Sequence, residues 1–366
     1  MPLRIGVNAL YLIPGGVGGT EIYLRSLLAA LAGIDPVNHY LVFTNRETGR
    51  DLVPKADNFT CLPQPVRAMS RPARILWEQV ALPLDTLRRR IDVLFNPGFT
   101  APILCPCPMV TVFHDLQHKR HPEYFRWFEH PFWRFFLFCA AHRSSRLIAV
   151  SDATAADLRE VYRLPPNVIT VVPHGVDPEF FRLRPIASAP PYILCVSTLH
   201  PHKNLERLLR AFAIFHRDRP EFRLIMAGMR GFHADELEKL RAELNLSEAA
   251  EFTGWIPRDR LYDLYAGATA FVYPSTFEGF GMPVLEAMAA GLPTGCSLIE
   301  PMSTIAADAA LQFDPDDTND LLDAMRRLTS EEPLRIKLSA AGPERAAKFK
   351  WETAAEITLE AIHQAL

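Results

Sequence analysis

Short apolar runs rich in β-branched and aromatic residues recur along the chain between longer segments of helical spacing. In the first half these runs lie at 4–10, 40–45, 92–98, 109–115, 147–152 and 169–176. The segment between the first two, Thr20–Ala32, has leucines and an isoleucine on one helical face. This alternation predicts a parallel sheet with helices on both faces, which is an α/β fold.

A second series of the same kind begins after the segment PIASAPP at 185–191, which has three prolines and no apolar periodicity. Its predicted strands lie at 192–198, 223–228, 250–255 and 270–275, with helical segments at 205–215 and 234–244. We therefore expect an N-terminal domain at 1–185, a linker at 186–191 and a second domain at 192–348. Residues 349–366 are expected to form a helix that packs back on the first domain.

Composition narrows the class of protein. The chain has 366 residues, 49% of them hydrophobic, which is enough to fill two cores. A net charge of −3 without basic clusters between aromatics argues against nucleic acid as a partner. The six cysteines form no CxxC pair and are expected to be buried thiols in a reducing compartment.

Location can also be predicted. The chain shows neither a cleavable apolar leader nor an uncharged apolar run of about 18 residues. We expect a cytoplasmic protein, with peripheral contact at the inner face of a membrane as an open possibility.

The stretch Ser275–Glu286, STFEGFGMPVLE, directly follows a predicted strand. Pro283 suits the first turn of a helix, which we expect over Val284–Ala290. Glycines before that helix let a ligand approach the backbone, and the N–H groups at its start suit a diphosphate. Glu286, about one turn into the helix, can accept hydrogen bonds from two ribose hydroxyls, while Glu278 lies before the helix.

Glu278 and Glu286, with seven residues between them, resemble the paired-glutamate motif of the retaining GT-B glycosyltransferases of family 4, as does the wider run EGFGMPVLEAMAAGLP. The resemblance implies two Rossmann-like doubly wound domains facing a central cleft. It also implies a nucleotide diphosphate sugar as co-substrate and no resident cofactor. In this family Glu286 would hold the nucleotide ribose, and Glu278 would contact the donor sugar.

Three further positions extend the resemblance. Lys203, after the predicted strand at 192–198, is similar to the family's diphosphate lysine, and Thr198 stands where the family often has an arginine. Gly16 lies in a glycine turn between the first strand and first helix, and His114 ends the run MVTVFHD. The expected catalytic residues are His114, Lys203 and Glu278; the expected donor contacts are Gly16, Thr198, His202, Lys203, Gly279, Phe280, Gly281, Met282 and Glu286.

No metal site is expected. Asp314 and Asp316 have the spacing of a metal-binding DxD, but they precede Leu321 in a context typical of helix caps. We therefore expect Lys203 and backbone N–H groups to stabilise the charge on the leaving nucleoside diphosphate.

The runs VFHDLQHKRHPEYF and VSTLHPHKNLERLL resemble a mannosyltransferase-like branch that builds bacterial surface polysaccharides. That resemblance makes GDP-mannose the first donor candidate and a saccharide or lipid-linked molecule the acceptor. The fold also hosts nucleotide-sugar epimerases and hydrolases, and a non-catalytic nucleotide-sugar-binding subunit is a further alternative.

Residues Glu123–Leu137, EYFRWFEHPFWRFFL, form an aromatic segment interrupted by Arg126 and Arg134. Residues 1–185 carry 21 Lys and Arg against 16 Asp and Glu, a net charge of +5. Such a segment could dock at anionic lipid. Its aromatic side chains could equally fill the N-terminal core.

Overall fold

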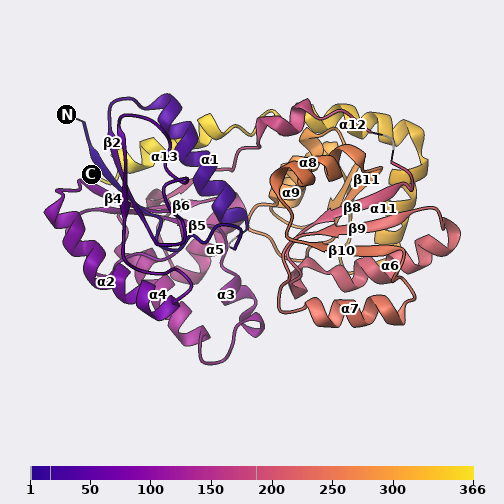
Figure 1. Cartoon of the computed structure of the whole chain (residues 1–366), viewed down its shortest axis with the longest axis horizontal. Helices are drawn as coiled ribbons and strands as arrows, with labels where there is room; N and C mark the ends of the chain where they lie inside the picture. Colours follow the sequence, from indigo (N-terminus) through magenta and orange to yellow (C-terminus); the bar gives the residue numbers. More distant parts are fainter. Residues whose placement is uncertain (1, 17, 187) are drawn as a thin grey trace. The chain divides into compact units, whose positions relative to one another are not determined.

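The computed structural model describes residues 2–16, 18–186 and 188–366. The chain divides into two compact units, residues 1–175 with 350–366 and residues 176–349. Each unit contains one parallel sheet with helices packed on it (Figure 1).

The first unit has a seven-stranded sheet in the order β3-β2-β1-β4-β5-β6-β7. All neighbouring strands are parallel. The strands are β1 (Arg4–Asn8), β2 (His39–Thr44), β3 (Phe59–Pro63), β4 (Val93–Asn96), β5 (Met109–Phe113), β6 (Arg146–Ala149) and β7 (Ile169–Val171). Because β4 and β5 are buried along their whole length, their sequences are nearly continuously apolar, with Asn96 and Thr111 as the polar exceptions.

Helices connect these strands, and one more arrives from the end of the chain. They are α1 (Gly19–Ile34), α2 (Arg71–Arg88), α3 (Gln117–Arg120), α4 (His130–Arg143), α5 (Asp152–Tyr162) and α13 (Trp351–His363), with 3₁₀ turns at Pro122–Tyr124 and Pro166–Val168. The C-terminal helix α13 packs on α1 of this unit. Gly175 lies against Trp351 so closely that a β-carbon would come within 2.3 Å of the Trp351 backbone nitrogen.

The second unit has a six-stranded parallel sheet in the order β10-β9-β8-β11-β12-β13. Its strands are β8 (Tyr192–Val196), β9 (Arg223–Ala227), β10 (Ala250–Gly254), β11 (Ala270–Tyr273), β12 (Thr294–Ser297) and β13 (Leu311–Phe313). Its helices are α6 (Leu205–Asp218), α7 (Ala234–Glu243), α8 (Arg258–Gly267), α9 (Met282–Ala289), α10 (Met302–Ala306), α11 (Thr318–Ser330) and α12 (Glu332–Ala346), with 3₁₀ turns at Pro178–Arg182, Pro201–Lys203 and Ala307–Ala309.

Helix α6 illustrates how the sequence builds this unit. Leu205, Leu208, Leu209, Phe212 and Phe215 recur at helical spacing, and all five are buried. Burying each such side chain contributes roughly 1.5–3 kcal/mol before the entropy cost of ordering it. The predicted helix at 205–215 therefore forms, extended to Asp218.

The division between the units differs from the expected linker at 186–191. The second unit begins at Val176, because the 3₁₀ turn at Pro178–Arg182 buries Phe180 against Tyr262 and Tyr265 of α8. Ile186 N–H then donates to the Ala266 carbonyl at 2.8 Å. Of the expected linker, Ala187 lies outside the described residues.

In both sheets the strand order reverses beside the first strand of the unit, between β1 and β4 and between β8 and β11. Ligands of open α/β sheets bind beyond the carboxyl ends of the strands at such a reversal. Each unit thus has one edge where side chains from successive loops meet.

Candidate functional site

The loop after β11 is tied to the turn after β8 by hydrogen bonds. The His202 carbonyl accepts from the Ser275 hydroxyl at 2.9 Å and from the Thr276 backbone N–H at 2.8 Å. These bonds hold Lys203, at the end of the 3₁₀ turn, beside Glu278 in the loop that leads to α9. Residues 75 positions apart are thereby brought to one edge of the second sheet.

Lys203 and Glu278 form an ion pair. Lys203 Nζ lies 2.6 Å from Glu278 Oε1 and 3.0 Å from the Tyr273 hydroxyl. The two charged side chains are only 14% and 11% exposed, so solvent screens the pair weakly. Burial and the Glu278 charge raise the pKa of Tyr273 well above its ordinary value, so this hydroxyl stays protonated.

The turn before α9 has the conformation that its glycines suggest. Gly281 has φ of 103°, a left-handed conformation that glycine adopts without strain, and a β-carbon there would meet Met302 at 3.0 Å. Met282 and Pro283 open α9, two residues earlier than the predicted start. The side chain of Phe280 is buried beside Phe349, which leaves its backbone as the part able to meet a donor.

Glu286 is 5% exposed and lies in a charged network that the sequence analysis did not identify. The Tyr265 hydroxyl donates to Glu286 Oε2 at 3.1 Å, and Arg258 Nη1 lies 3.4 Å from Oε1. Burial raises the pKa of Glu286, while the Arg258 charge opposes that rise. Two carboxylate oxygens with four lone-pair positions still leave acceptor capacity for a ligand.

Arg258 also binds a second acid. Its Nη2 donates to Asp177 Oδ2 at 3.0 Å, and the Tyr262 hydroxyl donates to the same oxygen at 2.5 Å. Burial alone would lower the pKa of Arg258, but Glu286, Tyr262 and Asp177 raise it above its ordinary value. Arg258 therefore stays protonated and offsets the negative charge of ionised Glu286. No spacing in the sequence links these residues.

Thr198 and His202 occupy the same edge. Both are half-buried, and the loop at Ser197 and Thr198 lies so close to Gly228 that a β-carbon there would come within 2.1 Å of the Ser197 carbonyl oxygen. The His202 carbonyl ties the two loops, and its ring lies 5.8 Å from that of His200. The structure thus gathers Thr198, His202, Lys203, Glu278, the Gly279–Met282 turn and Glu286 in the second unit.

His114 belongs to the first unit, at the carboxyl end of β5. Its Nε2–H donates to the Pro97 carbonyl at 2.9 Å, and its ring packs edge-on against Tyr23 and Phe99. Burial lowers the pKa of His114 to about 4. The imidazole is therefore neutral at physiological pH, with Nδ1 left as an acceptor.

Gly16 lies in the turn before α1. Its backbone N–H donates to the Ile13 carbonyl at 2.8 Å, and a β-carbon would come within 2.8 Å of the Ile13 side chain. Glu21 of α1 accepts from Gly15 N–H at 2.7 Å and so holds the turn. Val17, in the middle of the expected glycine turn, lies outside the described residues.

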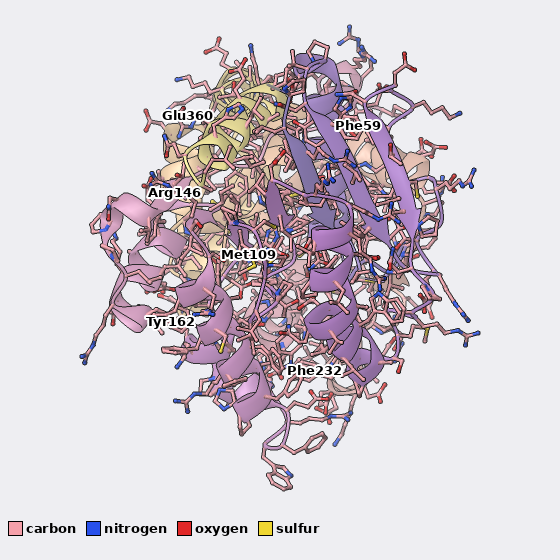
Figure 2. All side chains as sticks on the ribbon, turned by 90° about the vertical axis from the view of Figure 1, so that its left-hand side faces the viewer. Phe59, Met109, Arg146, Tyr162, Phe232 and Glu360 are labelled. Atoms are coloured by element: carbon pink, nitrogen blue, oxygen red, sulfur yellow. The ribbon has the colours of Figure 1, made fainter. Side chains whose placement is uncertain are left out.

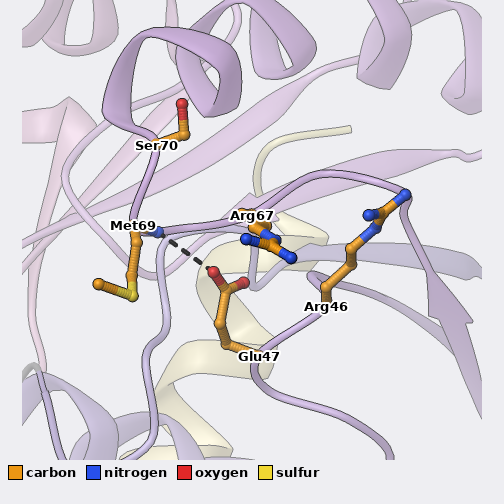
Figure 3. A pocket seen from close by; sticks show the side chains of 5 residues that line it. All are labelled: Arg46, Glu47, Arg67, Met69 and Ser70. Carbon is orange, nitrogen blue, oxygen red and sulfur yellow. Dashed lines mark hydrogen bonds between the residues drawn. The ribbon is translucent and has the colours of Figure 1, made fainter.

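The carboxyl edge of the first sheet also carries a pocket beyond β2 and β3, with a volume of about 550 Å³ (Figure 3). It is lined by Arg46, Glu47, Arg67, Met69 and Ser70. Glu47 accepts from the Ala68 and Met69 backbone N–H groups at 2.9 and 3.5 Å. Among the described residues neither arginine of the pocket forms an ion pair.

One turn further along α2, Arg74 is 6% exposed, and its Nε has no hydrogen-bond partner in the described part of the chain. Glu78, four residues on, is instead satisfied by Asn8 at 3.3 Å and Thr100 at 2.9 Å. Sequence reasoning missed this arginine because buried and exposed arginines on a helix look alike in a single sequence.

The aromatic segment 123–137 divides between core and surface. Leu137 is buried and Trp133 packs against the core, whereas Trp127 is 85% exposed. Phe128 before α4 and Phe132, Phe135 and Phe138 on it are exposed as well. Of the two alternatives left open by the sequence, core filling does not hold for the exposed aromatics of this segment, Trp127, Phe128, Phe132 and Phe135.

An apolar stripe lies on the neighbouring helix. Leu76, Val80, Leu84 and Leu87 of α2 are exposed at helical spacing. Leu104, in the segment between β4 and β5, is exposed as well. Helices α2 and α4 lie side by side in Figure 1, linked by Arg71 and Glu129 at 3.6 Å. The side of the first unit that carries both helices faces the viewer in Figure 2.

Among the described residues, no helix combines the length and the apolar content that a membrane span requires. In the same residues, three or more His, Cys, Asp or Glu side chains nowhere gather as a metal site would require. Asp317 caps α11 by accepting from Asn319 N–H at 2.8 Å, and Asp314 accepts from Asp316 N–H at 2.8 Å.

Two parallel-sheet Rossmann-like units define the α/β architecture of the GT-B glycosyltransferases. Two protein families match the sequence of this chain. The model of Glycosyltransferase Family 4 matches residues 17–180, and the model of Glycosyl transferases group 1 matches residues 176–345. Together the matches run through both units. The chain belongs to the family 4 GT-B glycosyltransferases and is similar to their mannosyltransferases.

Individual relatives support this assignment. O-antigen chain mannosyltransferase B of Escherichia coli is 29% identical over 268 residues, covering 69% of each chain. A D-inositol 3-phosphate glycosyltransferase of Thermobispora bispora is 30% identical over 242 residues, covering 61% of this chain and 56% of that one. The chain thus matches little more than half the length of this second relative.

Solved structures with the same fold include sucrose-phosphate synthase from Thermosynechococcus elongatus, with a TM-score of 0.81, 20% identity and coverage of 99% and 98% of the two chains. Anabaena HepE in complex with UDP and glucose has a TM-score of 0.76 and 17% identity, covering 99% of each chain.

Proposed function

We propose that this glycosyltransferase moves mannose from GDP-mannose to a saccharide or lipid-linked acceptor, with retention of anomeric configuration, in the synthesis of a bacterial surface polysaccharide. The observation that carries the proposal is the gathering of Lys203, Glu278 and Glu286 around the Gly279–Met282 turn at one edge of the second sheet. The names of the mannosyltransferase relatives support mannose as the sugar.

In this account the donor diphosphate meets Lys203 and the N-terminal end of α9. Charge accumulates on the diphosphate as the bond to the sugar breaks, so a preorganised ammonium group stabilises the transition state more than the ground state. Lys203 is held ready by Glu278 and Tyr273 at 2.6 and 3.0 Å. The Lys203 ammonium group has three N–H donors, so it can bind the diphosphate while it keeps a hydrogen bond to the protein.

Glu286 takes the ribose of the nucleotide. Its carboxylate accepts a hydrogen bond from Tyr265 and lies beside the positively charged Arg258. These contacts offset part of the desolvation free energy of the buried carboxylate before the donor binds. A preorganised acceptor of this kind loses little entropy on binding a diol.

The acceptor is assigned to the carboxyl edge of the first sheet. The pocket with Arg46 and Arg67 offers guanidinium donors there that form no ion pair within the described chain. Arg74 lies within the electrostatic influence of Glu78, but its Nε has no hydrogen-bond partner among the described residues. His114, neutral and with Nδ1 as an acceptor, suits a sugar hydroxyl on the same edge.

Release of GDP from GDP-mannose tests both the activity and its proposed independence of metal. We expect GDP to form when an oligosaccharide or lipid-linked acceptor is present, and the rate to survive exhaustive chelation, because Lys203 supplies the charge a metal would otherwise supply. The measurement is a coupled GDP assay before and after EDTA treatment. Loss of activity with EDTA and its rescue by manganese would contradict the metal-free mechanism, while release independent of any acceptor would favour a hydrolase.

We also propose that the apolar surface of α2 and α4, defined by Leu76, Val80, Leu84, Leu87, Leu104, Trp127, Phe128, Phe132, Phe135 and Phe138, docks on an anionic membrane. Exposed aromatic and aliphatic side chains bordered by arginines suit the headgroup boundary. A lipid-linked acceptor would be met at that boundary.

Co-sedimentation with anionic vesicles tests the docking surface. A Trp127→Ser, Phe135→Ser variant is expected to lose roughly tenfold or more in vesicle affinity, because two apolar side chains no longer leave water. Trp255→Ser is the matched control, since Trp255 is an exposed tryptophan of the second unit. Wild-type protein that ignores anionic vesicles, or equal losses in both variants, would refute the proposal.

A further inference from the structure

Cys105 and Cys107 flank a proline in the segment between β4 and β5, and their sulfur atoms lie 3.6 Å apart. Both thiols are half-buried, whereas Cys195 and Cys296 of the second unit are fully buried. The expectation that all six cysteines are buried thiols is therefore wrong for this pair, and for Cys61 and Cys139, which are also half-buried.

Within the pair, Cys105 is the thiol that ionises first. A hydrogen bond from the Cys107 thiol, with a second from the Cys107 backbone N–H, lowers the pKa of Cys105 to about 7, and burial opposes that shift. The pKa of Cys107 is raised in turn. Burial raises the pKa of Cys195 and Cys296 to about 12, so those thiols stay protonated.

Thiolate character and access together decide which cysteines react with oxidants. Cys105 has a neighbouring thiol within reach, and such a neighbour can resolve a mixed disulfide. A disulfide requires the sulfur atoms to approach to about 2.05 Å. Starting from 3.6 Å, side-chain rotation with a small movement of the Cys-Pro-Cys segment would close the gap.

We propose that Cys105 and Cys107 form a redox-modifiable thiol pair that small-molecule disulfides oxidise to an intramolecular disulfide. The Cys105 thiolate attacks one sulfur of the disulfide R–S–S–R, breaking that bond and releasing one thiolate. Cys107 then loses its proton to solvent, attacks Cys105 Sγ and releases the second thiolate. Two protein thiols are oxidised by two electrons, and one small disulfide is reduced to two thiols.

The pair lies before the amino end of β5, which begins at Met109, whereas His114 follows the carboxyl end of that strand. The proposal consequently rests on neither the donor site nor the acceptor assignment. A test of thiol chemistry can succeed or fail independently of the transferase activity.

The test is incubation of the reduced chain with oxidised glutathione at pH 7.5, followed by intact mass and peptide mapping. We expect wild-type protein to lose two hydrogens, with the new disulfide joining Cys105 and Cys107. Cys107→Ser should instead retain one glutathione on Cys105, and Cys105→Ser should react at least tenfold more slowly at this segment. Cys139→Ser, which removes another half-buried thiol, should behave as wild type.

Circular dichroism of the two serine variants establishes that they fold. A wild-type chain that accumulates glutathione on Cys105 without closing the disulfide would overturn the pairing of the two thiols. Faster modification of Cys61 or Cys139 than of Cys105 would overturn the assignment of Cys105 as the reactive thiol.

Discussion

Replacing Lys203 with methionine should lower kcat for sugar transfer by on the order of a hundredfold or more, with a smaller effect on donor affinity. That magnitude is typical of removing one preorganised donor aimed at developing negative charge. The ammonium group interacts most strongly after charge has moved onto the diphosphate, so its loss falls mainly on the transition state. Steady-state kinetics with GDP-mannose and acceptor measure the effect.

The kinetic effect of Lys203→Met must be distinguished from the effect of a folding defect. Removing Lys203 leaves Glu278 mostly buried with Tyr273 as its remaining partner, so thermal unfolding should accompany the kinetics. Lys203→Arg keeps the charge, and Lys239→Met removes an exposed lysine that is 80% accessible on α7 of the same unit. A folded Lys203→Met variant with unchanged kcat and raised KM would mean that Lys203 only anchors the donor.

The second large effect is expected at Glu286. Glu286→Gln should weaken binding of GDP by roughly 1.5–3 kcal/mol, the range for hydrogen bonds to a charged group, which is about a 10- to 150-fold loss in affinity. Glutamine keeps the shape and an acceptor for Tyr265, and Arg258 keeps Asp177 as its partner. Calorimetry with GDP measures the loss directly.

The thermal stability of Glu286→Gln shows whether a loss of GDP affinity arises from a folding defect. Because burial raises the pKa of Glu286, the folded state holds that proton more tightly than the unfolded chain does. Ionising Glu286 therefore costs folding free energy as the pH rises above the ordinary glutamate value of 4.5. The glutamine variant avoids that cost and should unfold at no lower temperature at neutral pH.

As the pH is lowered, the affinity of the wild-type protein for GDP should begin to fall above pH 4.5, because Glu286 takes up a proton there. The affinity of Glu286→Gln should not show this fall. Glu243→Gln, at an exposed position on α7, is the matched control. Unchanged GDP affinity in folded Glu286→Gln would remove the ribose assignment.

The sequence predicts those parts of this fold that depend on local periodicity. The buried strands β1, β4, β5, β8 and β9 appear as apolar runs, and Pro283 marks the start of α9 within two residues. Strands β3, β12 and β13 were not predicted, because residues such as Pro63, Gly295 and Gln312 interrupt the apolar pattern of a strand. Their pairing is set by neighbours in the sheet rather than by their own pattern.

Local sequence patterns also predict only part of the candidate site. The spacing of Glu278 and Glu286 within one segment identified both as candidate site residues. The ion pair of Lys203 with Glu278 depends instead on a hydrogen bond that joins two loops, from Ser275 to His202. The link from Asp177 through Arg258 to Glu286 spans 109 positions and follows from the packing of α8 on the 3₁₀ turn at Pro178–Arg182. Such long-range partners have no signature in a single sequence.

The central claim is acceptor-dependent transfer of a sugar with retention of configuration. It is tested most directly by NMR of the product formed from GDP-mannose that carries a ¹³C label at the anomeric carbon, incubated with the chain and an oligosaccharide acceptor. We expect one new anomeric signal of α configuration that appears only with acceptor and that grows on the order of a hundredfold more slowly with Lys203→Met. A β-linked product, free mannose alone or an epimerised nucleotide sugar would contradict it.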